Sequence, residues 1–234
     1  MVDKYTIYVL NQSSDTQTFW CFLSEPKELV SDPGVYANSA ASIAIKPNYK
    51  GLVSFGIPVQ YVVGAGASNN AVGLNVEIIS AISDGANLGD VWQAVYATVP
   101  PNMGPDLNGP AQGAPTNTIQ IVSNDFDKSH NEANGWFSNQ SFGILTEAGF
   151  MGMSWSPSPS IKRTITPKLS FYVAVGDFGS NSLASWNDVS VSSQVAVVPN
   201  DFSTNKATIT YSSTGKGRSN QGRPASPTCC LCPT

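Results

Sequence analysis

Short apolar segments that alternate with a period of two, separated by breaks rich in glycine, proline, asparagine and serine, recur along the chain. In the first of them Tyr5, Ile7 and Val9 occupy every second position. This period is that of a β-strand, because successive side chains point to opposite faces of a sheet. The pattern predicts an all-β fold, an antiparallel β-sandwich of jelly-roll or Greek-key type, over residues 1–212, and a flexible tail over residues 213–234.

Strand patterns cover most of the chain before the tail. Residues 4–23 and 141–156 have the pattern of hairpins, and the second is expected to turn at residues 146–149. Pro58 and Pro167 interrupt strand patterns, which favours sheet edges or bulges at both positions. The remaining expected strands lie within residues 42–47, 52–63, 72–82, 117–123, 163–176, 193–199 and 206–212.

Helical and loop patterns are few. Residues 88–99 have the spacing of a short helix, with Asp90 as N-cap and Trp92 on the apolar face. Residues 32–42 could form a short helical turn. The Pro/Gly-rich residues 99–117 are expected to form a long loop, and loops of that length are usually functional or disordered.

Charged residues are scarce, since 12% of the chain is Asp, Glu, Lys or Arg, against about 25% in an average globular protein. The net charge is −4, and Lys216, Arg218 and Arg223 put +3 on the tail, so the rest carries −7 (−4 minus +3). An acidic body argues against nucleic-acid binding, because phosphate contacts need a basic face. No signal-peptide pattern and no membrane-length apolar run is seen, so we expect a soluble protein made in the cytoplasm.

No catalytic motif has the context that its chemistry needs. Gly64 and Gly66 follow a strand pattern, but a dinucleotide-binding fold needs a helix next, so a turn or bulge is favoured. Residues 177–179 read Asp-Phe-Gly without the other kinase motifs, which again favours a turn. His130 is the only histidine and lies in a polar stretch, which favours a solvated loop residue rather than a base. We therefore expect no enzyme activity and no cofactor.

Two further groups, one of acidic and one of aromatic residues, could each either bind a ligand or have a structural role. Asp125, Asp127 and Glu132 could bind calcium, but they lack the ligand spacing and central glycine of an EF-hand, so a polar turn is favoured. A group of aromatic residues could stack on sugar rings, although aromatic side chains on strands are more often core. We favour the core and keep carbohydrate binding as an alternative function, because β-sandwiches are common lectin scaffolds. The group comprises Trp136, Phe137, Phe142, Phe150 and Trp155.

Three of the four cysteines, Cys229, Cys230 and Cys232, lie within the last six residues. Prenylation requires a cysteine at the fourth position from the end, which is Leu231 here. Palmitoylation beside the basic tail residues would direct the protein to a membrane. Metal binding lacks a fourth ligand. An incidental tail is the remaining alternative to intermolecular disulfide formation.

We favour intermolecular disulfides at these three positions and expect no metal. Adjacent cysteines bridge each other only with strain, whereas a Gly/Ser/Pro-rich tail lets the thiols reach other molecules. Cys21 lies in an apolar run and is expected to be an inert core thiol. A surface of Ser, Thr, Asn, Gln and Gly loses less side-chain entropy on contact than one of Lys and Glu, and low charge weakens mutual repulsion.

A β-rich body with few charges and the terminal thiol cluster "CCLC" resembles octin, the crystal-forming protein of zygomycete fungi, and its bacterial relatives. The resemblance implies vacuolar protein crystals that are held by intermolecular disulfides and sediment in gravity sensing. The sequence as a whole predicts a non-enzymatic, self-assembling structural or storage protein whose partner is itself. The alternative is a carbohydrate-binding or membrane-directed β-sandwich module.

Overall fold

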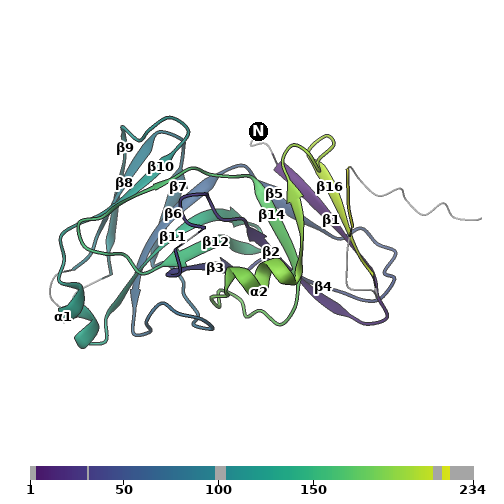
Figure 1. Ribbon diagram of the computed structural model, residues 1–234, viewed down its shortest axis with the longest axis horizontal. Helices are drawn as coiled ribbons and strands as arrows, with labels where there is room; N and C mark the ends of the chain where they lie inside the picture. The colour runs from purple at the N-terminus through teal and green to yellow at the C-terminus, as the bar shows by residue number, and fades with distance from the viewer. Residues whose placement is uncertain (1–3, 31, 98–103, 213–217, 222–234) are drawn as a thin grey trace, which may run out of the picture.

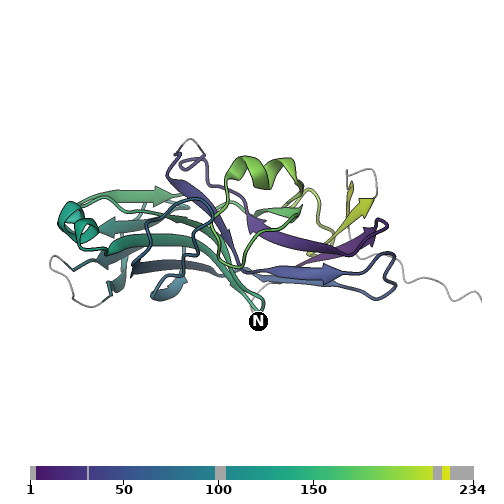
Figure 2. The ribbon, with the colours of Figure 1, turned by 90° about the horizontal axis from the view of Figure 1, so that it is seen from below.

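The computed structural model describes residues 4–30, 32–97, 104–212 and 218–221. Within these residues the chain is built from seventeen β-strands and two short helices, which confirms the predicted all-β, sandwich-like class. The body is elongated (Figures 1 and 2). Most strand pairs are antiparallel, but β1 pairs with β16 and β8 with β10 in parallel.

The strands form four sheets. One has the order β17 (Arg218–Gln221), β16 (Lys206–Ser212), β1 (Lys4–Gln12), β5 (Ser54–Pro58). The second has the order β15 (Ser193–Val197), β14 (Ser170–Val175), β2 (Gln17–Leu23), β4 (Ser42–Ile45). The third, five-stranded, has the order β3 (Val35–Ser39), β12 (Gly149–Trp155), β11 (Phe137–Thr146), β6 (Tyr61–Ser68), β7 (Ile82–Ala86). The fourth has the order β13 (Lys162–Ile165), β10 (Ile119–Ser123), β8 (Asp90–Val95), β9 (Asp106–Gln112).

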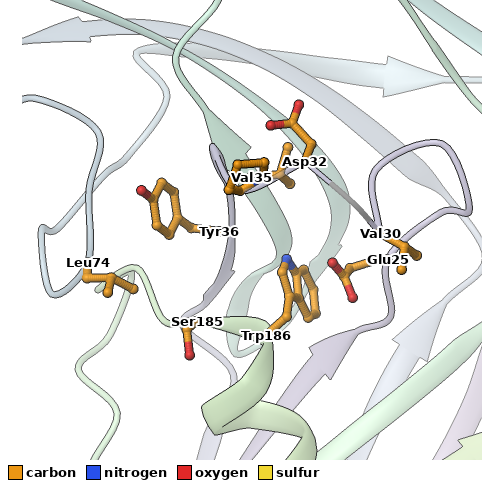
Figure 3. A pocket seen from close by; sticks show the side chains of 9 residues that line it. Glu25, Val30, Asp32, Val35, Tyr36, Leu74, Ser185 and Trp186 are labelled. Carbon is orange, nitrogen blue, oxygen red and sulfur yellow. The ribbon is translucent and has the colours of Figure 1, made fainter.

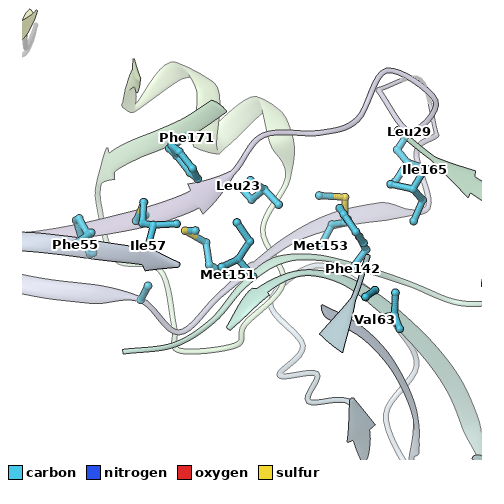
Figure 4. Packing of buried hydrophobic residues seen from close by; sticks show 14 of the residues in the cluster. Leu23, Leu29, Phe55, Ile57, Val63, Phe142, Met151, Met153, Ile165 and Phe171 are labelled. Atoms are coloured by element: carbon cyan, nitrogen blue, oxygen red, sulfur yellow. The ribbon is translucent and has the colours of Figure 1, made fainter. Parts of the chain in front are cut away.

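One hydrophobic core joins these sheets. The helix α1 (Lys128–Ala133) lies at the end of the molecule that holds β8, β9 and β10, whereas α2 (Trp186–Val191) lies over the middle (Figure 1). Each sheet contributes fully buried side chains to the same cluster, among them Ile57, Phe171, Phe142 and Ile165 (Figure 4). Burial of this shared apolar surface is the main favourable term that holds the sheets together.

The predicted hairpin over residues 4–23 is wrong. β1 pairs with β16 and β5, whereas β2 pairs with β14 and β4, so the two strands belong to different sheets. The side chain of Asn11 fixes the bend between them. Its Nδ2 donates to the carbonyl oxygens of Asp15 and Ile45, each at 2.8 Å, and its Oδ1 accepts from the Ser13 N–H at 3.0 Å.

Both predicted helical segments are strands instead. In residues 88–99 the buried positions Asp90, Trp92 and Ala94 alternate with more exposed ones, and this segment forms β8. Residues 32–42 contain β3 rather than a helical turn. The predicted loop over residues 99–117 contains β9, which pairs with β8 and includes a cis Gly109–Pro110 peptide bond.

The predicted strand over residues 72–82 is also wrong, since only Ile82 belongs to a strand there. Gly64 and Gly66, predicted in a turn or bulge, lie inside β6. A Cβ atom on Gly66 would lie 2.6 Å from the Asn139 side chain and 3.0 Å from the Ala81 backbone. These glycines therefore allow residues 80–81 to approach the sheet.

Other predictions hold. β11 and β12 form the predicted hairpin, which turns at residues 146–149. Pro58 ends the edge strand β5. Residues 177–179 follow β14 outside any strand.

Three further expectations are wrong. Pro167 lies in the loop between β13 and β14 rather than at an edge or bulge, so the expected strand over residues 163–176 is two strands of different sheets. The expected strand over residues 52–63 likewise contains β5 and the start of β6, which belong to different sheets. The predicted domain boundary at residue 212 is also passed, because β17 pairs with β16.

Candidate functional site

Cys229, Cys230 and Cys232, the predicted cross-linking residues, lie outside the described residues. Cys21 is the one cysteine in the described part of the chain, and it is a free thiol with no exposed surface. Burial raises the pKa of this thiol because a thiolate would lose its hydration. The prediction of an inert core thiol is confirmed, and Cys21 is not accessible to another molecule in this fold.

The polar stretch around His130 forms α1 rather than a loop, and His130 is exposed on it. The Asp127 carboxylate caps this helix by accepting from the His130 N–H at 2.9 Å. The Glu132 carboxylate lies 3.8 Å from the Lys128 ammonium group. Across the described ranges no three or more His, Cys, Asp and Glu side chains are grouped as metal ligands would be. In the same ranges no helix has the length and apolarity to cross a bilayer.

The predicted aromatic group is divided between core and surface. Phe142 and Trp155 are buried, as favoured, and the Trp155 Nε1–H donates to Gln140 Oε1 at 3.0 Å. The Arg163 guanidinium lies 4.9 Å from the centre of the Trp155 ring. The remaining three aromatic side chains of the group are partly exposed. The group therefore does not form a common aromatic surface for a ligand.

Residues 74–81 lie against the outer face of the five-stranded sheet, opposite the core. Main-chain hydrogen bonds join this segment to residues 181–183, and the adjoining Ala184 pairs with Ala37 of β3. The Asn38 Nδ2 donates to the Ile78 carbonyl oxygen at 2.9 Å, and the Ser80 and Ser141 hydroxyls are 2.7 Å apart. Two hollows adjoin this segment: Leu74 lines the first, and residues 78–80 line the second.

The first hollow, which we call the Trp186 pocket, is a cavity of about 420 Å³ between the loop that joins β2 to β3 and the start of α2 (Figure 3). In Figure 3 the Glu25 carboxyl lies beside the Trp186 ring and Tyr36 stands across the cavity. The pocket is lined by Glu25, Val30, Asp32, Pro33, Val35, Tyr36, Leu74, Ser185 and Trp186.

The start of α2 holds Trp186 in place. Ser185 is the N-cap, and its Oγ accepts from the Asp188 N–H at 3.0 Å, which satisfies one of the free donors of the first turn. The Trp186 ring packs against Tyr172, with the ring centres 6.4 Å apart. The Trp186 Nε1–H is buried and has no hydrogen-bond acceptor among the residues that the structure describes. An unpaired buried donor is costly.

The two carboxyl groups of the pocket lie in different environments. Asp32 accepts from Arg163 and from the Gly34 N–H, each at 2.9 Å. Burial opposes ionisation there, but these two hydrogen bonds and the Arg163 charge lower the pKa of Asp32 overall. Glu25 is half-buried, and in the described ranges no cation pairs with it. Burial raises its pKa to about 7.

The second hollow, which we call the apolar groove, has a volume of about 230 Å³ and lies beyond residues 78–80, over β11 and β12. Ile79 and Leu145 line it and are 63% and 55% exposed. Phe150 and Val62 continue the apolar lining, and the Ser80 and Ser141 hydroxyls form its polar part. The groove adjoins β7, an edge strand of its sheet.

Comparison with protein-family models, with curated proteins and with solved structures finds no match to this chain.

Proposed function

We propose that the protein is a non-enzymatic, self-assembling structural or storage protein whose copies are joined by disulfides through Cys229, Cys230 and Cys232. The observation that carries the proposal is the apolar groove, with its exposed aliphatic rim beside an edge strand, on a body with few charges. The resemblance to octin and its bacterial relatives agrees with this function. It also suggests an intracellular inclusion or a vacuole as the place of assembly.

The rim of the groove supports contact between copies. Ile79 and Leu145 are 63% and 55% exposed, although each is large and aliphatic. Covering such side chains contributes about 25 cal/mol for each Å² of apolar surface removed from water. We take a second copy of this chain as the occupant, since the residues that line the groove include no charged side chain by which to attract a charged partner.

The sheet edge beside the groove supports the same contact. β7 pairs with β6 along one side, and within the described residues no strand pairs with its other side. A free strand edge presents N–H and C=O groups that can pair with another chain. β9 of the fourth sheet lies close to β7 without pairing with it, and β7 carries one exposed charged residue, Asp84, and no lysine. The apolar groove and an unpaired strand edge therefore lie together.

Weak surface charge lowers the free-energy cost of close packing. In the described part of the chain there are three ion pairs, and one of them, Lys4–Glu147, is mostly exposed. Ordering a long, mobile side chain at an interface costs about 0.5–1.5 kcal/mol. Short neutral side chains avoid most of that cost and do not repel a neighbouring copy.

Disulfides would then lock contacts that the bodies have already made. Because Cys21 is buried, cross-linking falls to the tail. When neighbouring bodies are held together, the effective concentration of tail thiols reaches about the millimolar range. The lock requires an oxidising compartment, because cytosolic reductants keep exposed thiols reduced.

Light scattering of the full chain with and without reductant tests this proposal. The parent should form large particles under oxidising conditions and give ladders on non-reducing gels. Replacing Cys229, Cys230 and Cys232 by Ser should leave the thermal midpoint unchanged and make the assemblies dissolve on dilution. Ile79→Lys combined with Leu145→Lys should prevent particle formation, whereas Tyr49→Lys, at another exposed apolar side chain, should not.

Three results would contradict the proposal in whole or in part. A parent that stays monomeric at high concentration under oxidising conditions would exclude self-assembly. Intact-mass measurement that finds an acyl chain on a tail cysteine would support the membrane-directed alternative instead. Equal behaviour of the groove variant and the Tyr49→Lys control would show that the groove is not the contact.

A further inference from the structure

We propose that the Trp186 pocket binds a neutral saccharide, with one pyranose ring packed against the Trp186 indole and its hydroxyls bonded to Glu25. This inference does not depend on self-assembly. It rests on a cavity, an aromatic wall and a carboxyl group that pairs with no cation among the described residues, all in one place (Figure 3).

The walls of the pocket fit the apolar faces of a sugar ring. Trp186 and Tyr36 supply aromatic surface, and Leu74 and Val30, which are 52% and 59% exposed, form part of the apolar lining. Ligand sites of about 300–1,000 Å³ are typically apolar and aromatic with a few placed polar groups. The cavity of about 420 Å³ lies in that range. The C–H groups of a sugar would cover these exposed aliphatic side chains, and removing that apolar surface from water favours binding.

The polar group that a ligand can reach in the pocket is the Glu25 carboxyl, because the Trp186 Nε1 atom is buried. In Figure 3 this carboxyl lies at the side of the indole ring. When ionised, Glu25 only accepts hydrogen bonds, so its ligand must be a donor. A sugar hydroxyl can donate to the carboxylate while the C–H groups of the same sugar ring cover the indole.

The charges in the pocket argue against an anion. Arg163, the cation near Asp32, already bonds to that carboxylate at 2.9 Å. Glu25 would repel a phosphate or carboxylate ligand when it is ionised. The role of Asp32 is to hold the loop, because its oxygens accept from Arg163 and Gly34. Glu25 is thus the carboxyl group that remains for a ligand.

Saturation-transfer NMR on the full chain, kept reduced, tests the proposal. The probes are methyl glycosides of glucose, galactose and mannose, N-acetylglucosamine, maltose and cellobiose, with choline as the cationic control. At least one saccharide should receive saturation, chiefly at ring C–H protons. Trp186→Phe should retain part of the binding, whereas Trp186→Ala should weaken it about tenfold. Glu25→Gln should weaken it at pH 8.

Leu74→Lys gives a second test, because Leu74 is an exposed lining residue whose replacement leaves the core intact. It should reduce binding without lowering the thermal midpoint. Tyr49→Ala, at an exposed aromatic residue that is not part of the pocket, should bind like the parent. The proposal is overturned if no saccharide receives saturation, if choline binds in place of the saccharides, or if binding survives unchanged in both Trp186→Ala and Leu74→Lys.

Discussion

Replacing Glu25 by Gln should stabilise the protein at pH 8 and have little effect at pH 4.5. Burial raises the pKa of Glu25 from its ordinary 4.5 to about 7. Between these values the folded state binds more protons than the unfolded state, so stability decreases as the pH rises through this window. Above about pH 8 the carboxyl is ionised in both states and the whole penalty is present. Gln cannot ionise, so the variant lacks that penalty.

The magnitude follows from the shift in pKa and from the exposure of the side chain. At about 1.36 kcal/mol for each pH unit, the change from 4.5 to about 7 gives an upper limit of about 3.4 kcal/mol. Because Glu25 is only half-buried, water screens much of this cost, and we expect about 1 kcal/mol. For a domain of this size, that corresponds to a rise in thermal midpoint of about 2–4 °C.

Differential scanning calorimetry of reduced protein at pH 4.5 and pH 8 measures the effect. Glu28→Gln is the matched control, because hydrogen bonds from the Thr166 N–H at 3.1 Å and from its hydroxyl at 2.5 Å hold that carboxylate. Although burial acts in the opposite direction, these bonds lower the pKa of Glu28. Its stabilisation is present above about pH 4.5 and is lost as the pH falls, so Glu28→Gln should lower the midpoint at pH 8.

The reasoning is refuted if Glu25→Gln changes the midpoint equally at both pH values, because an effect that does not depend on pH cannot come from ionisation. A destabilised variant at pH 8 would show that ionised Glu25 has a partner that stabilises it. Either result would also remove Glu25 as the free acceptor of the Trp186 pocket.

Three other substitutions test the buried packing and the role of His130. Gly152→Ala should lower the free energy of unfolding by about 1–3 kcal/mol in urea titration. The reason is that the added Cβ would meet the Phe142 carbonyl oxygen and lie 2.5 Å from the Gly143 Cα. An unchanged urea midpoint would mean that β11 and β12 can move apart to accept the methyl group. Gln140→Ala should cost about 1–3 kcal/mol in the same assay, because Trp155 Nε1 would lose its acceptor, and a neutral result would count against the buried network. His130→Ala should stay within about 0.5 kcal/mol of the parent, and loss of any measured turnover with the fold intact would reveal an active site at α1.

The strand content could be predicted from the sequence, but the strand partners could not. β1 pairs in parallel with β16, whose residues lie about two hundred positions later in the chain, as Ile7↔Ala207 shows. Nothing in residues 4–23 signals that partner, whereas a hairpin is the default for two adjacent strands. The bend at Asn11 depends on a bond to Ile45 in a third strand. The hairpin over residues 141–156 was predictable because its pairing is local.

Residues 88–99 show how a helical pattern and a strand pattern can coincide. Trp92 and Tyr96 are four positions apart, which fits a helical face, but Ala94 between them is also fully buried. Alanine is small and a good helix former, so it does not identify the strand by itself. The pairing of this segment with β10 and β9 decides in favour of the strand.

The Trp186 pocket could not be predicted from sequence, because its residues come from segments about 150 positions apart. Glu25 lies two residues after the end of the buried strand β2 and precedes Pro26, which is the one local indication that it occupies an unusual position. Trp186 follows a capping serine, a pattern that predicts a helix start and carries no functional meaning. The predicted aromatic group, by contrast, falls within one region of the sequence, residues 136–155, and is divided between core and surface in the fold.

Neutral amide side chains supply long-range polar contacts in a body with few charges. Asn124 bonds to both the N–H and the carbonyl oxygen of Tyr96, at 2.8 and 3.0 Å, as a neighbouring strand would. Asn38 and Asn131 likewise donate to main-chain carbonyls of other segments. These bonds join separate segments of the chain without burying ions, which avoids the desolvation cost of buried charge pairs. The same residue types, when exposed, leave a surface that repels neither a second copy nor an uncharged ligand such as a sugar.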